Sequence, residues 1–322
     1  MRGAYKGVTA LFLCLLLSLG TFAASPETLI PGGNTVGLSL RTQGVSIVEF
    51  TKKEPKEAGL EKGDVIQKID GQTVREAQDV TEAVSRAQGR PLELSVLRKN
   101  EEKTYTLAPC KEEEGWQLGL MVRDHLNGIG TVTYYNQADD SFGALGHGVN
   151  EGNGLLPLEE GSVLPARVAS VVKGKKGEPG ALQGVLSGRT ELGQILRNTP
   201  QGVFGTMDCP GKNALPVAEE GEVREGAATI LSNIRGTEVK EYTVEITELN
   251  MNDSLNRNFL LKVTDPELLK ATGGIVQGMS GSPILQNGRI VGAVTHVLIN
   301  DPTKGYGIFI ENMLEAAENG VN

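Results

Sequence analysis

The segment with the clearest chemical potential is residues 278–283, GMSGSP, which place Ser280 in a turn framed by glycines. A serine hydroxyl becomes a nucleophile only when a base takes its proton and hydrogen-bond donors meet the oxyanion that forms. The glycines let the chain turn sharply and direct the N–H groups of Gly278 and Ser280 at one point. The segment predicts a nucleophilic serine with an oxyanion hole; an ordinary glycine-rich surface turn is the alternative.

An apolar segment, a QNGR turn and a second apolar run over residues 290–297 follow this serine. Asn-Gly between two apolar runs is a strong signal for a tight β-hairpin. A GxSGxP turn followed by a hairpin resembles the nucleophile turn of chymotrypsin-like peptidases, in which the hairpin borders the substrate.

His147 is the best candidate for the base, because it ends the apolar run FGALGHG between two glycines. Flanking glycines leave an imidazole exposed, whereas a histidine packed in a core usually has bulky neighbours; a core histidine is the alternative. His125 lies in a polar segment and is predicted to be on the surface. His296 lies in the second strand of the hairpin, in position to contact a bound peptide.

The acid that would orient this base is not singled out by the residues themselves. The candidates are Asp139, Asp140, Asp208, Asp253, Asp265 and Asp301. Asp265 ends an apolar run and precedes Pro266, so its side chain is held at a defined strand end. Capping of a helix is the alternative role for an aspartate in that place.

Composition limits the possible functions. The chain has 322 residues, 42 glycines, 4% aromatic residues and a formal net charge of -9. This length suffices for two domains with hydrophobic cores, and many glycines with few aromatics favour short strands over long helices. The negative charge argues against nucleic acid or an anionic membrane surface as the main partner.

Residues 1–24 have the layout of an export signal, with Arg2 and Lys6 ahead of an apolar run and small residues after it. An uncleaved membrane anchor is the alternative. Cys110 and Cys209 follow this segment, and the sequence leaves open whether they pair. No CxxC or HExxH pattern occurs and the histidines are far apart, so neither a metal nor a cofactor is expected.

Residues 30–109 are predicted to form one compact α+β module. Val80, Ala83, Val84 and Ala87 recur at the spacing of one apolar helix face. Strands are expected at 45–50, 92–98 and 104–107. Together with the stretch AGLEKGDVIQKIDG over residues 58–71, this arrangement resembles the PDZ domains attached to bacterial proteases.

The resemblance implies that an extended peptide adds as a strand beside the helix. The residues expected to hold the terminal carboxylate of that peptide through their N–H groups are Gly37, Leu38, Ser39 and Leu40. A module that binds nothing and only positions its neighbour is the alternative.

Residues 110–322 consist of short apolar runs that alternate with glycine turns, which indicates an all-β barrel or sandwich. Four motifs in order, GIGTVTY, FGALGHG, GMSGSP and GAVTHV, resemble the stage IV sporulation protein B peptidase family. The resemblance implies a mainly β chain, with a chymotrypsin-like double β-barrel serine peptidase over 110–322 preceded by the PDZ domain. It also implies a triad of His147, Asp265 and Ser280, although most chymotrypsin-like enzymes have the acid further ahead of the serine.

The family implies a secreted serine endopeptidase that acts in endospore formation, in the space between the two forespore membranes. Such enzymes cut a membrane-anchored regulatory protein and themselves, and so release an intramembrane protease that processes a sigma factor. Two alternatives are a catalytically silent PDZ protein that only binds peptides and a general envelope quality-control protease. The latter usually carries its PDZ domain after the peptidase.

Overall fold

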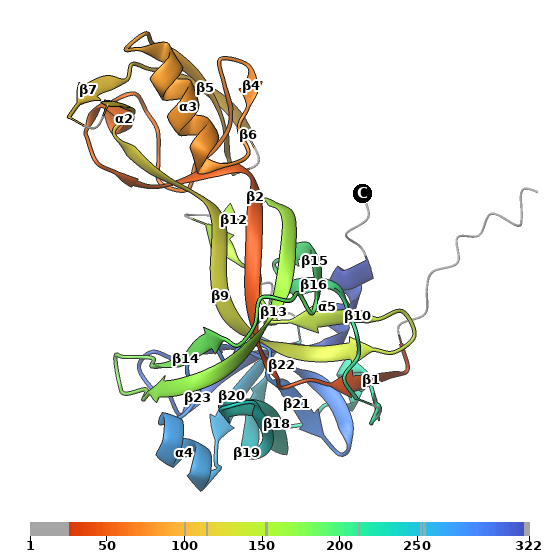
Figure 1. Ribbon diagram of the computed structural model, residues 1–322. Coiled ribbons are helices and arrows are strands. Elements are labelled where there is room, and N and C mark those ends of the chain that lie inside the picture. The colour runs from red at the N-terminus through yellow and green to blue at the C-terminus, as the bar shows by residue number, and fades with distance from the viewer. Residues whose placement is uncertain are drawn as a thin grey trace, which may run out of the picture.

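The computed structural model describes residues 26–99, 101–113, 115–151, 154–211, 213–251, 253 and 256–318. The predicted export signal, residues 1–24, lies outside the described residues. The chain is mainly β, as predicted. It forms two barrels and a smaller module joined to them by long strands (Figure 1).

Six strands close the first barrel around a core that includes Val132, Phe142 and Val203. In ring order they are β2 (Thr35–Phe50), β9 (Leu120–Asn136), β10 (Ser141–Ala144), β16 (Gly202–Met207), β15 (Gly193–Thr199) and β13 (Leu158–Val172). Beside the ring lie β1 (Thr28–Pro31), β14 (Ala181–Leu186) and β17 (Leu215–Pro216). The small hairpin of β11 (Asn150–Glu151) and β12 (Gly154–Leu155) follows β10.

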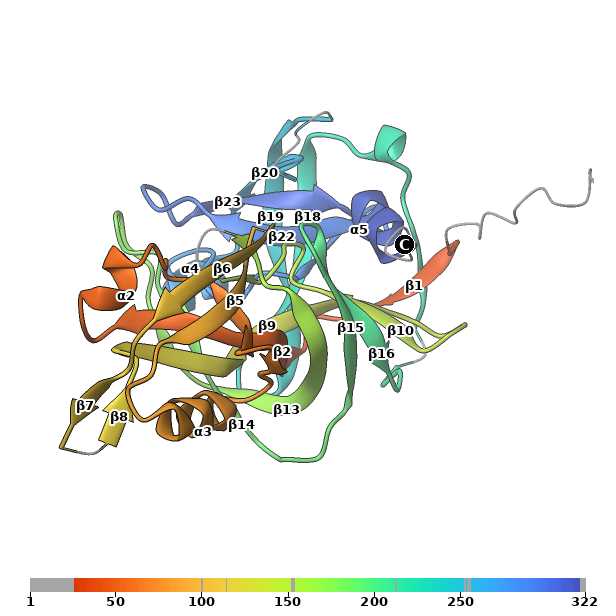
Figure 2. The same ribbon diagram turned by 90° about the horizontal axis from the view of Figure 1, so that it is seen from above.

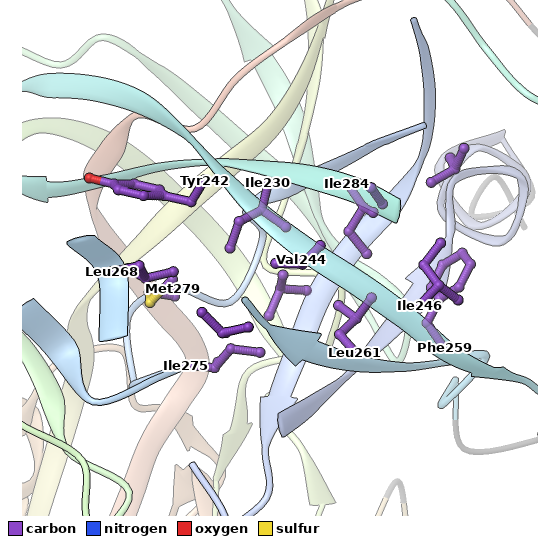
Figure 3. Close-up of a cluster of buried hydrophobic side chains, with 14 of the residues drawn as sticks. Ile230, Tyr242, Val244, Ile246, Phe259, Leu261, Leu268, Ile275, Met279 and Ile284 are labelled. Carbon is purple, nitrogen blue, oxygen red and sulfur yellow. The ribbon is translucent and has the colours of Figure 1, made fainter. Parts of the chain in front are cut away.

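The second barrel is also closed. Its strands in ring order are β18 (Gly226–Arg235), β19 (Glu238–Leu249), β20 (Phe259–Val263), β23 (Lys304–Phe309), β22 (Arg289–Val297) and β21 (Pro283–Gln286). Alternate residues of β19 point inward, among them Tyr242, Val244 and Ile246, and they build the cluster drawn in Figure 3. The predicted double β-barrel is therefore confirmed.

Three helical segments accompany the barrels. The short 3-10 turn η1 (Glu220–Glu222) precedes β18, α4 (Pro266–Thr272) follows β20, and α5 (Ile310–Glu318) follows β23. The QNGR hairpin turn forms as predicted, with Asn287 at φ 52° and Gly288 at φ 76°. Positive φ at both central residues is the geometry that Asn-Gly favours.

The PDZ module is built from the outer parts of β2 and β9 together with the segments between them. These are α2 (Glu54–Glu57), β3 (Val65–Ile69), β4 (Gln72–Thr73), α3 (Ala77–Ala87), β5 (Leu92–Arg98), β6 (Glu101–Leu107), β7 (Cys110–Glu112) and β8 (Gly115–Gln117). The expected amphipathic helix is α3, and its Val80 and Val84 are buried against the sheet.

The module precedes most of the peptidase in the chain, as predicted, and it is continuous with the first barrel through β2 and β9. Along one pair of strands, Leu38 of β2 faces Gly128 of β9 in the barrel, and Ile47 faces Val122 in the module. Figures 1 and 2 show the two strands running from one body into the other. Leu118, which follows the predicted PDZ range in the chain, also packs in the core of the module.

This arrangement contradicts the predicted carboxylate-binding loop. Gly37, Leu38, Ser39 and Leu40 lie in β2, which pairs with β13 on one side and β9 on the other. Their stretch of backbone already has strand partners at both edges, so it offers no free edge to a peptide. The predicted loop is thus the middle of a strand, because pairing with β13 and β9 extends it on both sides.

Two further findings concern features left open by the sequence. Cys110 and Cys209 are both free thiols. Within the part of the chain that the structure describes, no helix is long and apolar enough to cross a membrane.

Candidate active site

Ser280 and His147 line one cavity of about 590 Å³, although they come from different barrels. The same cavity is lined by Leu126 and Ile129 of β9 and by Ile275 and Val276 ahead of the serine. Among the residues that the structure describes, the lining of this cavity contains no aspartate, glutamate, lysine or arginine. The fold thus brings together two of the three predicted triad residues.

The turn that carries Ser280 is anchored by the residue before it. Met279 is fully buried in the core of the second barrel, in the same cluster as Leu268 and Ile275 (Figure 3). Gly278 and Gly281 have φ angles of +94° and +95°, which side chains rarely adopt. The glycines and the buried methionine together hold Ser280 at the cavity.

The backbone of this turn directs two N–H groups away from its own hydrogen bonds. The Gln277 carbonyl accepts a hydrogen bond of 2.8 Å from the N–H of Leu182, and the Met279 carbonyl accepts one of 3.0 Å from Ser282. In a trans peptide the N–H points opposite to the preceding C=O. The N–H groups of Gly278 and Ser280 therefore point away from these bonds, and neither has an acceptor among the described residues.

The imidazole of His147 is set up to act as a base through Nε2. Its Nδ1 lies 2.9 Å from the Gly148 carbonyl oxygen. Because a carbonyl can only accept, Nδ1 carries the hydrogen and the lone pair stays on Nε2. Burial lowers the pKa of His147, while the Gly148 carbonyl raises it by less. The ring is therefore neutral at pH 7.

Asn198 holds the backbone that follows this histidine, and nothing in the sequence had marked it. Its side-chain amide accepts from the Val149 N–H and donates to the Val149 carbonyl, both at 2.8 Å, and it donates to the Leu156 carbonyl at 3.0 Å. A lone asparagine in a polar run carries no motif, so only the fold reveals this contact.

The Ser280 hydroxyl does not bond to His147 in this conformation. It donates to the Thr295 carbonyl oxygen at 2.7 Å. The hydroxyl of Thr295 is itself buried and has no partner among the described residues. In this conformation the Ser280 hydroxyl is therefore bonded to the wall of the cavity. His147, which lines the same cavity, already has the tautomer that a base requires.

The other two histidines differ in setting. His296 lines the cavity, and its ring centroid lies 5.0 Å from that of His147. Desolvation first, and then the proximity of His147 and Arg257, lower the pKa of His296 to about 4. His125 is exposed, as predicted, and bonds through Nδ1 to Asp124 at 2.8 Å.

Asp265 is not brought to His147. It is the N-cap of α4, where its carboxylate accepts from the Leu268 N–H at 2.9 Å and from the Thr243 N–H at 3.4 Å. It does not line the cavity. The capping role that was the alternative is the one seen here. The expected contact with the imidazole is absent because helix α4 occupies the carboxylate and the Gly148 carbonyl occupies Nδ1.

A serine in a glycine turn, a neutral histidine across the cavity and two free amides define the site of a serine peptidase, here with an inserted PDZ module. The family model for SpoIVB peptidase S55 matches residues 114–314, and a PDZ domain model matches residues 35–108. The chain belongs to the SpoIVB peptidase S55 family and is a serine endopeptidase.

Other likenesses are weaker. A Clostridium perfringens protein described as a zinc metalloprotease is 36% identical over 66 residues, and the chain spans only 20% of its length. The Rv3671c protease of M. tuberculosis in its active form has a TM-score of 0.38 at 14% identity, covering 60% of this chain and 75% of that one. The HtrA-type protease AlgW with a tripeptide has a TM-score of 0.38 at 14% identity, covering 60% and 57%. Scores this low carry no argument about function.

Proposed function

We propose that this endopeptidase is an exported signalling protease of endospore formation, which cuts a membrane-anchored regulatory protein and also its own chain. The observation that supports the peptidase chemistry is the meeting of Ser280, His147 and two free amides at one cavity, in a chain of the S55 family. The site of action that we propose is the space between the two forespore membranes, in line with the export signal expected for residues 1–24.

In the mechanism, Ser280 attacks the substrate carbonyl while His147 Nε2 takes its proton. The N–H groups of Gly278 and Ser280 stabilise the oxyanion, and His147 then protonates the leaving amine. Water repeats the cycle and releases the acyl group. Asp265 supports this machinery from a distance, because the helix that it caps contributes Leu268 to the cluster that anchors Met279.

The substrate side chains that enter the cavity are uncharged and mostly apolar. The wall is formed by residues such as Ile129, Ile275 and Val297, with no charged group to pair with an ionic side chain. An unpaired charge buried there would lose more free energy of hydration than its contacts with the wall could provide. Peptides with an apolar residue at the cleaved bond are therefore the expected substrates.

The peptide edge of the PDZ module is proposed to be the outer part of β9. Over residues 120–127, β9 pairs with β2 on one side, and the described residues contain no strand partner on the other. Its Asp124 accepts a hydrogen bond of 3.1 Å from Ala77, the first residue of α3. A free strand edge beside a helix is the arrangement to which an extended peptide adds.

The test uses the full chain as its own substrate. Full-length Ser280→Ala protein is incubated with a small amount of the wild-type protein, and the products are mapped by mass spectrometry. Cleavage in trans, after uncharged residues and only when the wild-type chain is present, is the expected result. No cleavage by a wild-type chain that reacts with a fluorophosphonate would contradict self-processing, and cuts beside charged residues would contradict the substrate class.

A further inference from the structure

Thr131 of β9 touches both halves of the catalytic machinery, although no motif assigns it a role. It is fully buried. Its hydroxyl donates to the Gly278 carbonyl at 2.8 Å, and its N–H donates to the Ser280 carbonyl at 3.2 Å. Its own carbonyl accepts from the N–H of Leu145, two residues ahead of His147, at 3.2 Å.

We propose that Thr131 is a positioning residue of this peptidase, which fixes the nucleophile turn of the second barrel against the histidine segment of the first. The case for threonine at this position depends on its hydroxyl, because almost any residue would supply the two backbone hydrogen bonds. By holding the Gly278 carbonyl, it fixes the peptide plane between Gly278 and Met279. That plane is the link between the two amides that meet the oxyanion.

The neighbourhood of Thr131 shows how closely the two barrels approach there. A Cβ atom on Gly281 would lie 2.0 Å from the Thr131 carbonyl oxygen and 2.6 Å from the Leu145 nitrogen. Glycine at 281 is therefore a condition for this contact. The strand that carries Thr131 continues outward into the PDZ module, so the same β9 backbone joins the module to the catalytic turn.

The chain offers a matched control on the same strand. Thr133 is also fully buried, but its hydroxyl has no hydrogen-bond partner among the described residues. A threonine-to-valine change preserves the shape at either position and removes only the hydroxyl. Loss of the Thr131 hydroxyl leaves the Gly278 carbonyl without its donor. Loss of the Thr133 hydroxyl breaks no hydrogen bond, so no other group becomes unpaired.

The experiment compares Thr131→Val, Thr131→Ser and Thr133→Val in the full-length protein. The rate of labelling by a fluorophosphonate is measured together with hydrogen exchange in the fragment that contains Gly278 and Ser280. Thr131→Val should slow labelling roughly 10- to 100-fold, the scale of a small misplacement of reacting groups. It should also speed exchange in that fragment. Thr131→Ser, which keeps the hydroxyl, and Thr133→Val should behave as the wild-type protein does.

Unchanged exchange and labelling in Thr131→Val would overturn the proposal, and so would an equal effect in all three variants. Hydrogen exchange does not depend on turnover. If the wild-type protein fails to react with the fluorophosphonate, that failure counts against the nucleophile assignment, and the exchange data still decide the role of Thr131.

Discussion

The Ser280 hydroxyl donates to the Thr295 carbonyl at 2.7 Å, while His147 on the same cavity holds its own hydrogen on Nδ1. In the proposed mechanism, the hydroxyl must leave that carbonyl and turn to Nε2 of His147, since a proton moves only between groups in hydrogen-bonding contact. The amides of Gly278 and Ser280 already face away from the bonds that fix their peptide planes. Activation therefore begins at the Ser280 side chain rather than at the backbone of the turn.

Replacement of Ser280 by alanine should abolish labelling by a fluorophosphonate, because the probe reacts with an activated hydroxyl. Ser282 is the matched control. It lies two residues further on, is fully buried, and donates to the Ser232 hydroxyl at 3.1 Å. Ser282→Ala should still be labelled. Mass spectrometry of the modified peptide identifies the residue, and a label that persists in Ser280→Ala would disprove the assignment.

Asp265 can be tested by separating its charge from its capping ability. Asparagine caps helices as well as aspartate does, whereas alanine at such a position costs about 1 kcal/mol. Asp265→Asn should therefore keep both the melting temperature and the labelling rate close to those of the wild-type protein, and Asp265→Ala should lower the melting temperature. An asparagine variant with unchanged stability but a loss on the order of 10⁴-fold would instead place the carboxylate beside His147 in the active form.

The core elements of this fold were predictable because they carry local signals. The spacing of Val80 and Val84 identified α3, and Asn287-Gly288 identified the hairpin, since side-chain periodicity and turn chemistry act over a few residues. Gly37 and Leu40 illustrate the limit. The sequence placed them in a carboxylate-binding loop, but long-range pairing with β13 and β9 makes them part of a strand with both edges used.

For the candidate site, too, local signals could be recognised in the sequence and long-range contacts could not. Glycines around Ser280 and His147 were readable because unusual backbone geometry demands glycine in the chain itself. The role of Thr131, which lies in the GIGTVTY motif, and that of Asn198 could not be predicted, because they depend on contacts with segments 147 and 49 positions away. The sequence offered Asp265 two roles with equal weight, and only the Leu268 contact distinguishes them in this conformation.

Gly281→Ala should disrupt the site more than any other glycine change in the hairpin region. Its new methyl group would meet the Thr131 carbonyl oxygen at 2.0 Å, at a φ of +95°. Gly288 is the control, since its φ is +76° but nothing lies within 4 Å of an added Cβ. Backbone strain of this kind costs on the order of 1–3 kcal/mol by itself. Chemical unfolding should show that cost in both variants, with loss of labelling only in Gly281→Ala.

The pH dependence of labelling should report the buried imidazole. His147 acts as a base only when neutral, and burial lowers its pKa below the ordinary value of 6.5. The midpoint of the fall in labelling rate should therefore lie below pH 6.5. His296, with a pKa of about 4, remains neutral in that range and adds no second step. A midpoint at or above 6.5, measured from initial rates between pH 4.5 and 8, would contradict the buried setting.

The PDZ module depends on an ion pair that is largely shielded from water. Arg98 bonds to both carboxylate oxygens of Asp64 at 2.6 Å, and the Asp64 side chain is 1% exposed. Asp64 holds the pKa of the Arg98 guanidinium above its usual value, and the guanidinium stays charged without this partner because arginine is not deprotonated in proteins. Asp64→Ala removes the buried partner and leaves Arg98 with only the exposed Glu61 carboxylate and the Gly59 carbonyl, so it should cost about 3 kcal/mol in unfolding free energy. The control is Glu57→Ala, which breaks the exposed pair with Lys53 and should change stability by less than about 0.5 kcal/mol. Urea unfolding of both full-length variants measures the difference, and equal midpoints would show that the module does not rely on the Asp64 pair.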